Sequence, residues 1–380
     1  KTTDAVGLVL ATDLTSPEPL PSFANSSMDG YAVVATDVAA ATRERPAVLH
    51  VSGEIAAGQG DLPEVAPGQA ARIMTGAPLP RGADAVVPVE VTREQDGRVA
   101  VYRPSPSGEF VRTVGQDVAA GQPLLRQGHR IRPQDIGLLS ALGISRVRVH
   151  PHPRVVVIST GDELVPSDRT PGPGQIRDSN GPMLGSLVRH AGGHPYLAGI
   201  VRDDRRKLMN AFDSNLGHAD LVIATGGVSA GAYDHVQEVI GALGTVQGVK
   251  VAMQPGMPQV FGRIGAVPVL GLPGNPVSGF VSFEVFVRPV LRGMQGRRDR
   301  FRPSVEAVLT DDVRSPRDKR SFLRVRLRRK EGQWHATPTG SQGSHVLSSI
   351  VAADGLAEVP EDRTEVGAGD RLTVHLLVDA

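Results

Sequence analysis

Two glycine-rich turns contain the residue types best suited to binding an anion. The first is Thr225-Gly-Gly-Val-Ser229 and the second is Gly271-Leu-Pro-Gly-Asn-Pro-Val-Ser278. Each follows a short apolar run, which predicts a buried strand that ends in a loop. Glycine lets backbone N–H groups approach an anion closely, and ligands of α/β proteins bind at such strand ends. One such turn is equally consistent with a plain tight turn, but two in one domain favour a site for a phosphate or another oxyanion.

Acidic residues near the ends of predicted strands are candidate metal ligands. Glu163, Asp203 and Asp234 follow strands of one inferred parallel sheet, so they are expected to converge at one edge of it. Asp29 and Asp117 lie in loops of an earlier part of the chain. Taken singly, each residue is typical of a helix cap or a turn. Carboxylates beside anion-binding loops are also how proteins hold Mg²⁺ against phosphates, so the group predicts nucleotide or phosphoryl chemistry.

Other possible catalytic groups give weaker signals. The histidines have no metal-ligand spacing, and only His345, in Gly343-Ser-His, lies in a motif of interest. The chain has no cysteine, which excludes disulfides, thiolate metal sites and a cysteine nucleophile. Arg324, Arg326 and Arg328 alternate along a predicted strand. This pattern indicates either a solvated strand face or a wall that attracts an anionic ligand.

Strands that alternate with helices are expected to position the two turns. The predicted strands span residues 154–158, 195–201, 221–224 and 267–270. The predicted helices span residues 205–216, 235–243 and 277–291, and a further helix is expected to begin with Asn180 as its cap. This alternation predicts an α/β region with a mostly parallel, right-handed sheet.

The regions on either side of the α/β region are expected to form β structure. Alternating runs bounded by turn residues, such as 47–51, 98–102 and 322–328, are typical of strands. A length of 380 residues predicts two to four domains. The net charge of +1 argues against nucleic acid or an anionic membrane as the main partner. Because no apolar run is long enough to span a membrane and no signal peptide is visible, we expect a cytoplasmic protein.

Six motifs, in chain order, resemble those of one enzyme family. They are Asn25-Ser-Ser-Met-Asp-Gly-Tyr-Ala32, Arg72-Ile-Met-Thr-Gly-Ala-Pro78, Ser159-Thr-Gly-Asp-Glu-Leu164, the two glycine-rich turns and Gly340-Ser-Gln-Gly-Ser-His345. Together they are similar to the molybdopterin molybdenumtransferases, the MoeA family, whose eukaryotic relative is the gephyrin E domain. The resemblance covers essentially the whole chain.

The resemblance implies an α/β plus β multidomain fold that assembles as an elongated homodimer. It implies a central three-layer α/β domain with a mostly parallel sheet, an inserted β domain and a C-terminal β-barrel-like domain. The implied linker or dimerisation domain comprises residues 1–22 and 116–150. The other implied domains are the inserted β domain at 23–115, the molybdopterin-binding domain at 151–296 and the C-terminal domain at 302–380.

The resemblance also implies a molybdenum insertase. Molybdenum passes from molybdate to adenylylated molybdopterin, AMP is released and Mg²⁺ is required. The implied site lies between the α/β domain of one subunit and the β domain of its partner, which would supply Asp29, Thr75 and Asp117. The enzyme that adenylylates molybdopterin is a further expected partner.

The residues that match the family's motifs fall into groups by expected role. The expected catalytic residues are Asp29, Thr75, Asp117, Glu163, Asp203 and Asp234, of which Glu163, Asp203 and Asp234 would hold Mg²⁺. The residues expected to bind the pterin nucleotide or an oxyanion are Gly226, Gly227, Ser229, Lys250, Pro273, Gly274, Asn275 and Ser278. Arg324 and Ser344 resemble the residues on the molybdate side of the site.

One motif departs from the family pattern. Where many members read Lys-Pro-Gly-Lys-Pro, this chain reads Gln254-Pro-Gly-Met257-Pro258. A bound oxyanion would lose up to two compensating cations there. Either Lys250 or Arg263 substitutes for them, or oxyanion handling is altered, or the two replacements are harmless.

Two other functions stay open at this point. A molybdopterin adenylyltransferase would account for the α/β region, although the flanking β regions argue against it. A scaffold that binds molybdopterin without catalysis would account for the lost lysines, although the retained carboxylates argue against it.

Overall fold

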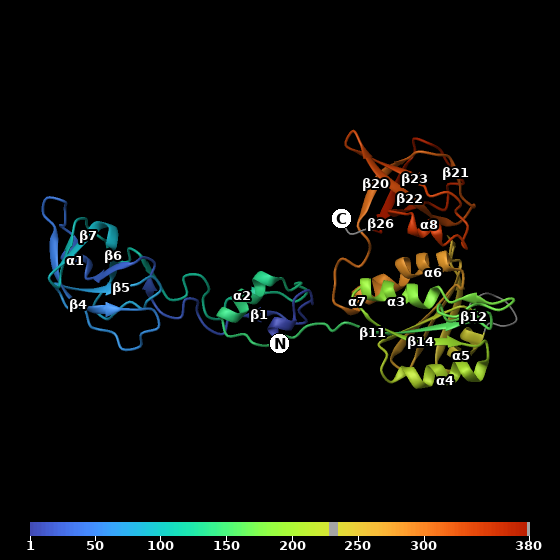
Figure 1. The fold of residues 1–380 in the computed structure, drawn as a ribbon, viewed down its shortest axis with the longest axis horizontal. Coiled ribbons are helices and arrows are strands. Elements are labelled where there is room, and N and C mark those ends of the chain that lie inside the picture. The colour runs from blue at the N-terminus through green and yellow to red at the C-terminus, as the bar shows by residue number, and fades with distance from the viewer. Residues whose placement is uncertain (228–234, 378–380) are drawn as a thin grey trace. The chain divides into compact units, whose positions relative to one another are not determined.

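The computed structural model describes residues 1–227 and 235–377, which form two compact units. The first unit comprises residues 1–149, and the second begins at His150 (Figure 1). Along the described part of the chain, no helix is both long and apolar enough to cross a membrane.

The first unit is built around a six-stranded sheet. Its strand order is β6-β3-β5-β4-β8-β7, and all pairs are antiparallel except β4 with β5. The strands are β3 (Gly30–Val33), β4 (Ala47–Ile55), β5 (Gln69–Ile73), β6 (Ala85–Pro88), β7 (Thr92–Gln95) and β8 (Arg98–Val101). Because neighbouring residues of a strand point to opposite faces, Ala70 and Ala71 pack into different apolar clusters. The β structure predicted around residues 47–51 and 98–102 is therefore present.

Short elements complete the first unit. They are η1 (Thr2–Asp4), β1 (Leu14–Thr15), β2 (Asn25–Ser26), α1 (Ala35–Val38), η2 (Val89–Val91), β9 (Val111–Arg112), β10 (Pro123–Leu125) and α2 (Pro133–Ala141). β1 pairs with β10 and β2 with β9. Each pair joins two segments that are about a hundred residues apart in the sequence. The pair therefore holds together the two ends of the long stretch of chain between them.

Asp135 anchors α2 and makes this region sensitive to acid. Burial raises the pKa of its carboxyl, but hydrogen bonds from Arg132 and His129 outweigh that effect and lower the pKa to about 2. The stabilisation is present above the unfolded pKa near 4 and is lost as pH falls towards 2. We expect Asp135→Asn to cost about 2 kcal/mol of unfolding free energy at pH 7. Urea unfolding at several pH values should show the difference from wild type shrinking between about pH 5 and pH 2; a constant difference would contradict the assignment.

The second unit contains a mixed six-stranded sheet with helices on both faces. Its strand order is β14-β11-β15-β19-β18-β16; the first four strands run parallel, and β18 pairs antiparallel with β19 and with β16. The strands are β11 (Arg154–Thr160), β14 (His194–Val201), β15 (Leu221–Thr225), β16 (Thr245–Lys250), β18 (Pro258–Ile264) and β19 (Val267–Leu272). The four predicted strands are present, whereas β16 and β18 were not predicted.

Alternation along β11 explains why both faces of this sheet are covered. Val156 and Ile158 pack in a cluster with Leu208, Phe212 and Val236 of α4 and α5. Val155 and Val157 pack instead with residues of α3 and of the segment that follows α6. The helices are α3 (Asn180–His190), α4 (Arg205–Leu216), α5 (His235–Leu243), α6 (Pro276–Ser282), a π-helical turn (Phe283–Val287) and α7 (Arg288–Met294). Figure 1 shows α4 and α5 on the face opposite α3, α6 and α7.

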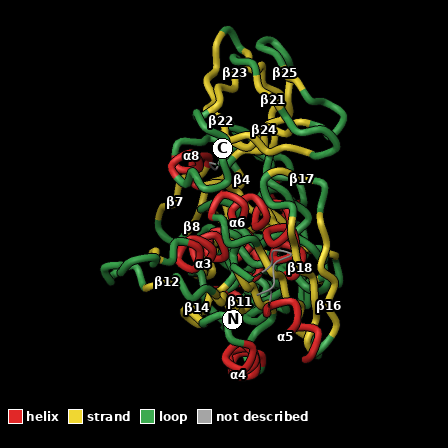
Figure 2. Tube along the Cα trace, turned by 90° about the vertical axis from the view of Figure 1, so that its right-hand side faces the viewer, coloured by secondary structure: helices red, strands yellow, loops and turns green. Residues whose placement is uncertain are grey.

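The C-terminal region is a closed barrel of five strands. The order β22-β23-β20-β26-β24 returns to β22, so none of these strands has a free edge. The strands are β20 (Ser304–Leu309), β22 (Arg320–Lys330), β23 (Gln333–Pro338), β24 (Gly355–Val359) and β26 (Arg371–Leu376). Figure 2 shows the barrel next to α6, on the side of the sheet away from α4. The short elements of the second unit are β12 (Leu164–Val165), β13 (Ile176–Arg177) and β17 (Met253–Gln254), which precede the barrel, and β21 (Val313–Arg314), α8 (Ser348–Val351) and β25 (Glu365–Val366).

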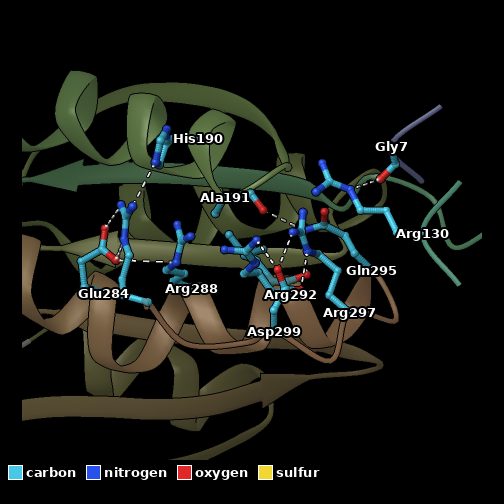
Figure 3. A network of polar contacts seen from close by, with 12 residues as sticks. Gly7, Arg130, His190, Ala191, Glu284, Arg288, Arg292, Gln295, Arg297 and Asp299 are labelled. Atoms are coloured by element: carbon cyan, nitrogen blue, oxygen red, sulfur yellow. Dashed lines mark hydrogen bonds and ion pairs between the residues drawn. The ribbon is translucent and has the colours of Figure 1, made fainter. Parts of the chain in front are cut away.

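A buried ion pair holds the π-helical turn against the start of the barrel (Figure 3). Arg302 donates to both oxygens of the Glu284 carboxylate, at 2.9 and 3.0 Å. Its third nitrogen lies 3.2 Å from Nε2 of His190 in α3. A paired, two-pronged contact of this kind fixes geometry as well as charge. The network therefore joins α3, the π-helical turn and the segment that leads into β20.

One local expectation is wrong, and one of the two alternatives left open for the arginine strand holds only in part. Asn180 does not cap α3: it is the first helical residue, Ser179 occupies the cap position without a side-chain hydrogen bond, and the Asp178 carboxylate accepts from the Gly181 N–H. The strand that carries Arg324, Arg326 and Arg328 is not a uniformly solvated face, because Arg324 is 1% exposed while the other two are exposed. Leu323 and Val325 fill the barrel interior, so Arg324 lies on the outer face of β22, where α8 and the loop around residue 343 cover this end of the strand.

Candidate active site

Seven of the predicted site residues of the α/β region line one cavity of about 600 Å³. The cavity lies at the carboxyl ends of β11, β14, β15 and β19, as expected for a sheet with parallel strands. The predicted residues that line it are Glu163, Asp203, Gly226, Gly227, Pro273, Gly274 and Asn275. A second cavity, of about 550 Å³, is mainly apolar and is lined by none of the predicted site residues. We therefore place the candidate site in the first cavity.

Two carboxylates face this cavity from neighbouring strands. Glu163 follows β11, and its carboxylate folds back over Gly161, where an added Cβ would lie 2.6 Å from Oε2. Asp203 follows β14 and accepts a hydrogen bond from the Thr160 hydroxyl at the end of β11. Asp204, its neighbour, accepts from the Lys207 N–H and caps α4 instead. The two adjacent aspartates thus have different tasks, and only Asp203 lines the cavity.

The first glycine-rich turn requires glycine for steric reasons. Gly226 has φ of +93°, and a Cβ there would lie 2.2 Å from the carbonyl oxygen of Thr160. Only glycine adopts this backbone conformation without strain. The Gly226 N–H, which we expected to face a phosphate, donates to Leu272 at 3.2 Å because the pairing of β15 with β19 extends into the turn. Ser229 and Asp234 lie outside the described residues.

The second turn meets a loop of the barrel. The Asn275 amide donates to the Ser344 hydroxyl at 3.3 Å, and the Val277 N–H donates to the Ser344 carbonyl at 3.2 Å. These contacts place His345 on the cavity wall. His345 stands out in the sequence because of its motif, Gly343-Ser-His, but no role was assigned to it.

Four of the predicted binding residues that the structure describes do not line the cavity: Ser278, Lys250, Arg324 and Ser344. Ser278 is buried within α6. Lys250 is exposed at the end of β16, paired in register with Pro258, which does line the cavity. Arg324 is buried on the outer face of β22, beneath α8 and the loop around residue 343, where its guanidinium donates to Ser349 and to the carbonyls of Phe322 and Gly343.

The Arg324 guanidinium is a buried cation with no carboxylate among the hydrogen-bond partners that the structure describes for it. Burial lowers its pKa to about 10, which still leaves it protonated at neutral pH. A buried charge without an opposite charge is costly, so an anion beside it would be strongly favoured. Through Gly343 the guanidinium also holds the segment that carries Ser344 and His345.

In the first unit, Asp29 and Thr75 are brought together. The Thr75 hydroxyl and N–H each donate to one oxygen of Asp29 at 2.7 Å, and these bonds lower the pKa of the Asp29 carboxyl. The two segments meet because β3, which follows Asp29, pairs with β5, which precedes Thr75. Asp117 is elsewhere in the unit, in a depression of about 460 Å³ with Asn25 and Arg112.

Sequence reasoning missed several polar residues of the cavity wall, of which three are charged or amide side chains. Arg177, Asp178 and Asn180 line it, from β13 and the start of α3. The Asp178 carboxylate accepts from the Gly181 N–H at 2.9 Å and so caps α3. The segment Asp178-Ser-Asn180 looked like an ordinary helix start, and only the three-dimensional structure places it beside the glycine-rich turns.

Three family models match the chain in order. The MoeA N-terminal region (domain I and II) matches residues 1–143, a probable molybdopterin binding domain matches 156–293, and the MoeA C-terminal region (domain IV) matches 306–377. The chain belongs to the MoeA family.

Relatives of this MoeA chain span nearly its whole length. Molybdopterin molybdenumtransferase 2 of Mycobacterium tuberculosis is 45% identical over 378 residues, which cover 98% of this chain and 93% of the relative. The molybdopterin molybdenumtransferase of a Nostoc species is 37% identical over 376 residues, 97% of this chain and 86% of that protein. A crystal structure of the molybdopterin biosynthesis MoeA protein of Pyrococcus horikoshii superposes with a TM-score of 0.86 at 35% identity, over 100% of this chain and 94% of that one.

The replaced lysine motif of this MoeA chain lies where β17 meets the barrel. Gln254 is exposed, Met257 is half-buried and Pro258 reaches the cavity. Neither Lys250 nor Arg263 is among the described residues of the cavity wall, and Arg263 lies near the far end of β18. The substitution of either for the lost lysines is therefore not supported.

The described wall of the cavity is rich in carboxylates for a site that binds an anion. Glu163, Asp178 and Asp203 face one guanidinium, that of Arg177, and the imidazole of His345. Within the described residues, 1–227 and 235–377, no group of three or more His, Asp or Glu side chains is placed to hold a metal ion. Mg²⁺ usually binds one or two carboxylates together with substrate phosphates, so the donor set of this cavity fits that ion.

Proposed function

We propose that this chain is a molybdenum insertase of molybdenum cofactor biosynthesis. It takes adenylylated molybdopterin and molybdate, hydrolyses the adenylyl bond, releases AMP and leaves molybdenum on the pterin. The observation that carries the proposal is the meeting of two glycine-rich turns with the carboxylates of Glu163 and Asp203 in one cavity. The family membership and the names of the relatives support the same reaction.

The residues divide the work by their position around the cavity. The backbone of Gly227 and the second glycine-rich turn would hold the nucleotide phosphates, with Ser229 and Ser278 nearby in sequence. Glu163, Asp203 and Asp234 would hold Mg²⁺, which supplies charge neutralisation for the phosphates when bound. Asp203 would also orient water, because the Thr160 hydroxyl fixes one of its two oxygens. Arg324 and Ser344 would favour molybdate at the barrel side.

Reconstitution of the cofactor tests this function. Purified protein is mixed with molybdopterin-AMP, molybdate and Mg²⁺, and the product is scored by activation of a cofactor-free molybdoenzyme. We expect activation that depends on all three additions. Activation by ATP and molybdopterin alone, without molybdate-dependent turnover, would identify an adenylyltransferase instead. Tight binding of molybdopterin-AMP without any product would identify a scaffold.

Arg324 gives a prediction that separates the two substrates. Arg324→Met keeps most of the side-chain volume and removes the buried charge, so the KM for molybdate should rise about tenfold. The KM for molybdopterin-AMP should change less than about twofold, because this charge is on the molybdate side. Steady-state kinetics with each substrate varied in turn measures both values. Equal increases in the two KM values would contradict the assigned role.

We further propose that the enzyme is a homodimer whose site is completed by the partner subunit's Asp29, Thr75 and Asp117. The tight pairing of Asp29 with Thr75 supports a shared task for these two residues. The same proposal includes four domains: a dimerisation domain at 1–22 and 116–150, an inserted β domain at 23–115, a three-layered central domain at 151–296 and a C-terminal domain at 302–380. It also includes a cytoplasmic location. The adenylyltransferase that supplies the substrate is the expected transient partner.

Mixed dimers test whether the site is shared between subunits. Asp29→Ala and Asp203→Ala are each expected to be inactive when alone. Co-expressed, about half of the dimers are mixed, and in each mixed dimer one of the two sites keeps both aspartates, so about a quarter of wild-type activity should return to the mixture. Two differently tagged subunits allow the mixed dimer to be purified, and it should have about half of wild-type activity. No recovery in that purified dimer would show that both aspartates act within one subunit, and activity of Asp29→Ala alone would show that Asp29 does not act at the site.

A further inference from the structure

Asn180 joins the two glycine-rich turns through a single side-chain nitrogen. Its Nδ2 donates to the Thr225 hydroxyl at 2.9 Å and to the Gly274 carbonyl at 2.7 Å. Thr225 begins the first turn and Gly274 lies in the second. The Thr225 hydroxyl in turn donates to the Pro273 carbonyl at 3.3 Å. The result is a closed set of hydrogen bonds between α3, β15 and the loop after β19.

The side chain is available for this contact because another residue caps α3. Asp178 accepts from the Gly181 N–H, which is the capping role we expected of Asn180. Asn180 is only 8% exposed, and it lines the cavity. Both hydrogens of its amide group are directed to acceptors, while its Oδ1 has no hydrogen-bond partner among the described residues. The orientation of the amide is therefore fixed by the two turns rather than by the helix.

The two turns also lie close together. A Cβ added to Gly274 would be in ordinary van der Waals contact with the Cα of Gly226, at 3.5 Å, so the space between the two backbones is about one methyl group wide. The pairing of β15 with β19 ends at Thr225 and Leu272 and reaches the first turn through the Gly226 N–H, whereas Gly274 lies beyond it. A buried hydrogen bond in a region of low dielectric is strong and directional. Asn180 supplies two of them at the point of contact.

We propose that Asn180 is a positioning residue that locks the two glycine-rich turns into one preformed phosphate-binding surface. The inference rests on the proposed function, because it takes these turns as the nucleotide-binding part of the site. A preformed surface lowers the cost of ordering on binding, so its loss weakens substrate binding. Glu163 and Asp203 follow other strands and are not held by Asn180, so the chemical step is affected less.

The test compares Asn180→Ala with a matched control, Asn215→Ala. Asn215 is equally buried in the same domain, and its Nδ2 donates to the Ala211 carbonyl at 2.7 Å within α4, away from the cavity. We expect the KM for molybdopterin-AMP to rise at least about tenfold in Asn180→Ala, with kcat within about threefold of wild type. Asn215→Ala should lower thermal stability and leave this KM unchanged. A loss of folded protein scales the apparent kcat and does not alter KM, so the split separates positioning from folding.

Thr225 provides a second route to the same answer. Thr225→Val has nearly the same shape without the hydroxyl and should raise the KM in the same direction, whereas Thr225→Ser should recover most of that effect. An unchanged KM in both Asn180→Ala and Thr225→Val, with wild-type turnover intact, would overturn the role of Asn180 and leave the proposed function standing. If the wild-type protein shows no molybdopterin-AMP turnover and calorimetry detects no binding of AMP, both would be overturned.

Discussion

Asp203→Ala is expected to lower kcat for AMP release by at least about a hundredfold. Its carboxylate lines the cavity and is fixed by the Thr160 hydroxyl. Under the proposed function, this carboxylate would hold Mg²⁺ or accept a proton from the attacking water. Alanine removes that acceptor without adding bulk. Single-turnover AMP release, measured with saturating substrate, reports the chemical step directly. The affinity for AMP in the absence of Mg²⁺ should change little or improve, because a negative charge is removed from an anion site.

Asp204→Ala is the matched control for this prediction. Asp204 is the next residue, is exposed and caps α4 by accepting from the Lys207 N–H, which lowers the pKa of its carboxyl. Its loss should slightly lower thermal stability and leave kcat unchanged. Comparable losses of kcat in the two variants would mean that the loop after β14, and not the Asp203 carboxylate, matters for the reaction.

Gly226→Ala is expected to destabilise the protein by at least about 3 kcal/mol and to remove substrate binding. The backbone there has φ of +93°, and the added Cβ would lie 2.2 Å from the Thr160 carbonyl oxygen. Neither atom belongs to a flexible side chain, so the turn itself must move. Thermal unfolding measures the stability, and calorimetry with AMP measures binding in whatever fraction remains folded.

Gly274→Ala is the matched control. It shows whether the loss of stability in Gly226→Ala comes from the steric clash or from replacing any glycine of the site. A Cβ on Gly274 meets nothing closer than 3.5 Å, which is an ordinary contact. This variant should therefore fold with nearly wild-type stability. If Gly226→Ala proves as stable as Gly274→Ala, the described conformation of the first turn is wrong.

Much of this site was predictable from the sequence because the relevant signals are local. An apolar run followed by Thr-Gly-Gly or by Leu-Pro-Gly-Asn predicts a strand end and a turn without knowledge of the fold. Parallel strands then bring those ends together, so Glu163, Asp203 and both turns were expected at one edge, and the described cavity contains them. Asp234 and Ser229, which lie outside the described residues, stay predictions.

The parts that sequence reasoning missed depend on contacts between distant segments. Nothing local distinguishes Asn180 from a helix cap, because its partners Thr225 and Gly274 are more than 40 residues away in the sequence. Arg324 alternates with two exposed arginines, and its burial follows from α8 and the loop around residue 343, which cover one end of β22. Likewise the Gly226 N–H could not be assigned to Leu272 before the pairing of β15 with β19 was known.

Single-turnover release of AMP from molybdopterin-AMP, with Mg²⁺ and with or without molybdate, tests the central claim most directly. We expect release that depends on both Mg²⁺ and molybdate and that yields active cofactor, despite Gln254 and Met257 in the motif near the barrel. Tight binding of molybdopterin-AMP with no release of AMP under any of these conditions would contradict the proposed insertase and identify a protein that binds the nucleotide without turning it over.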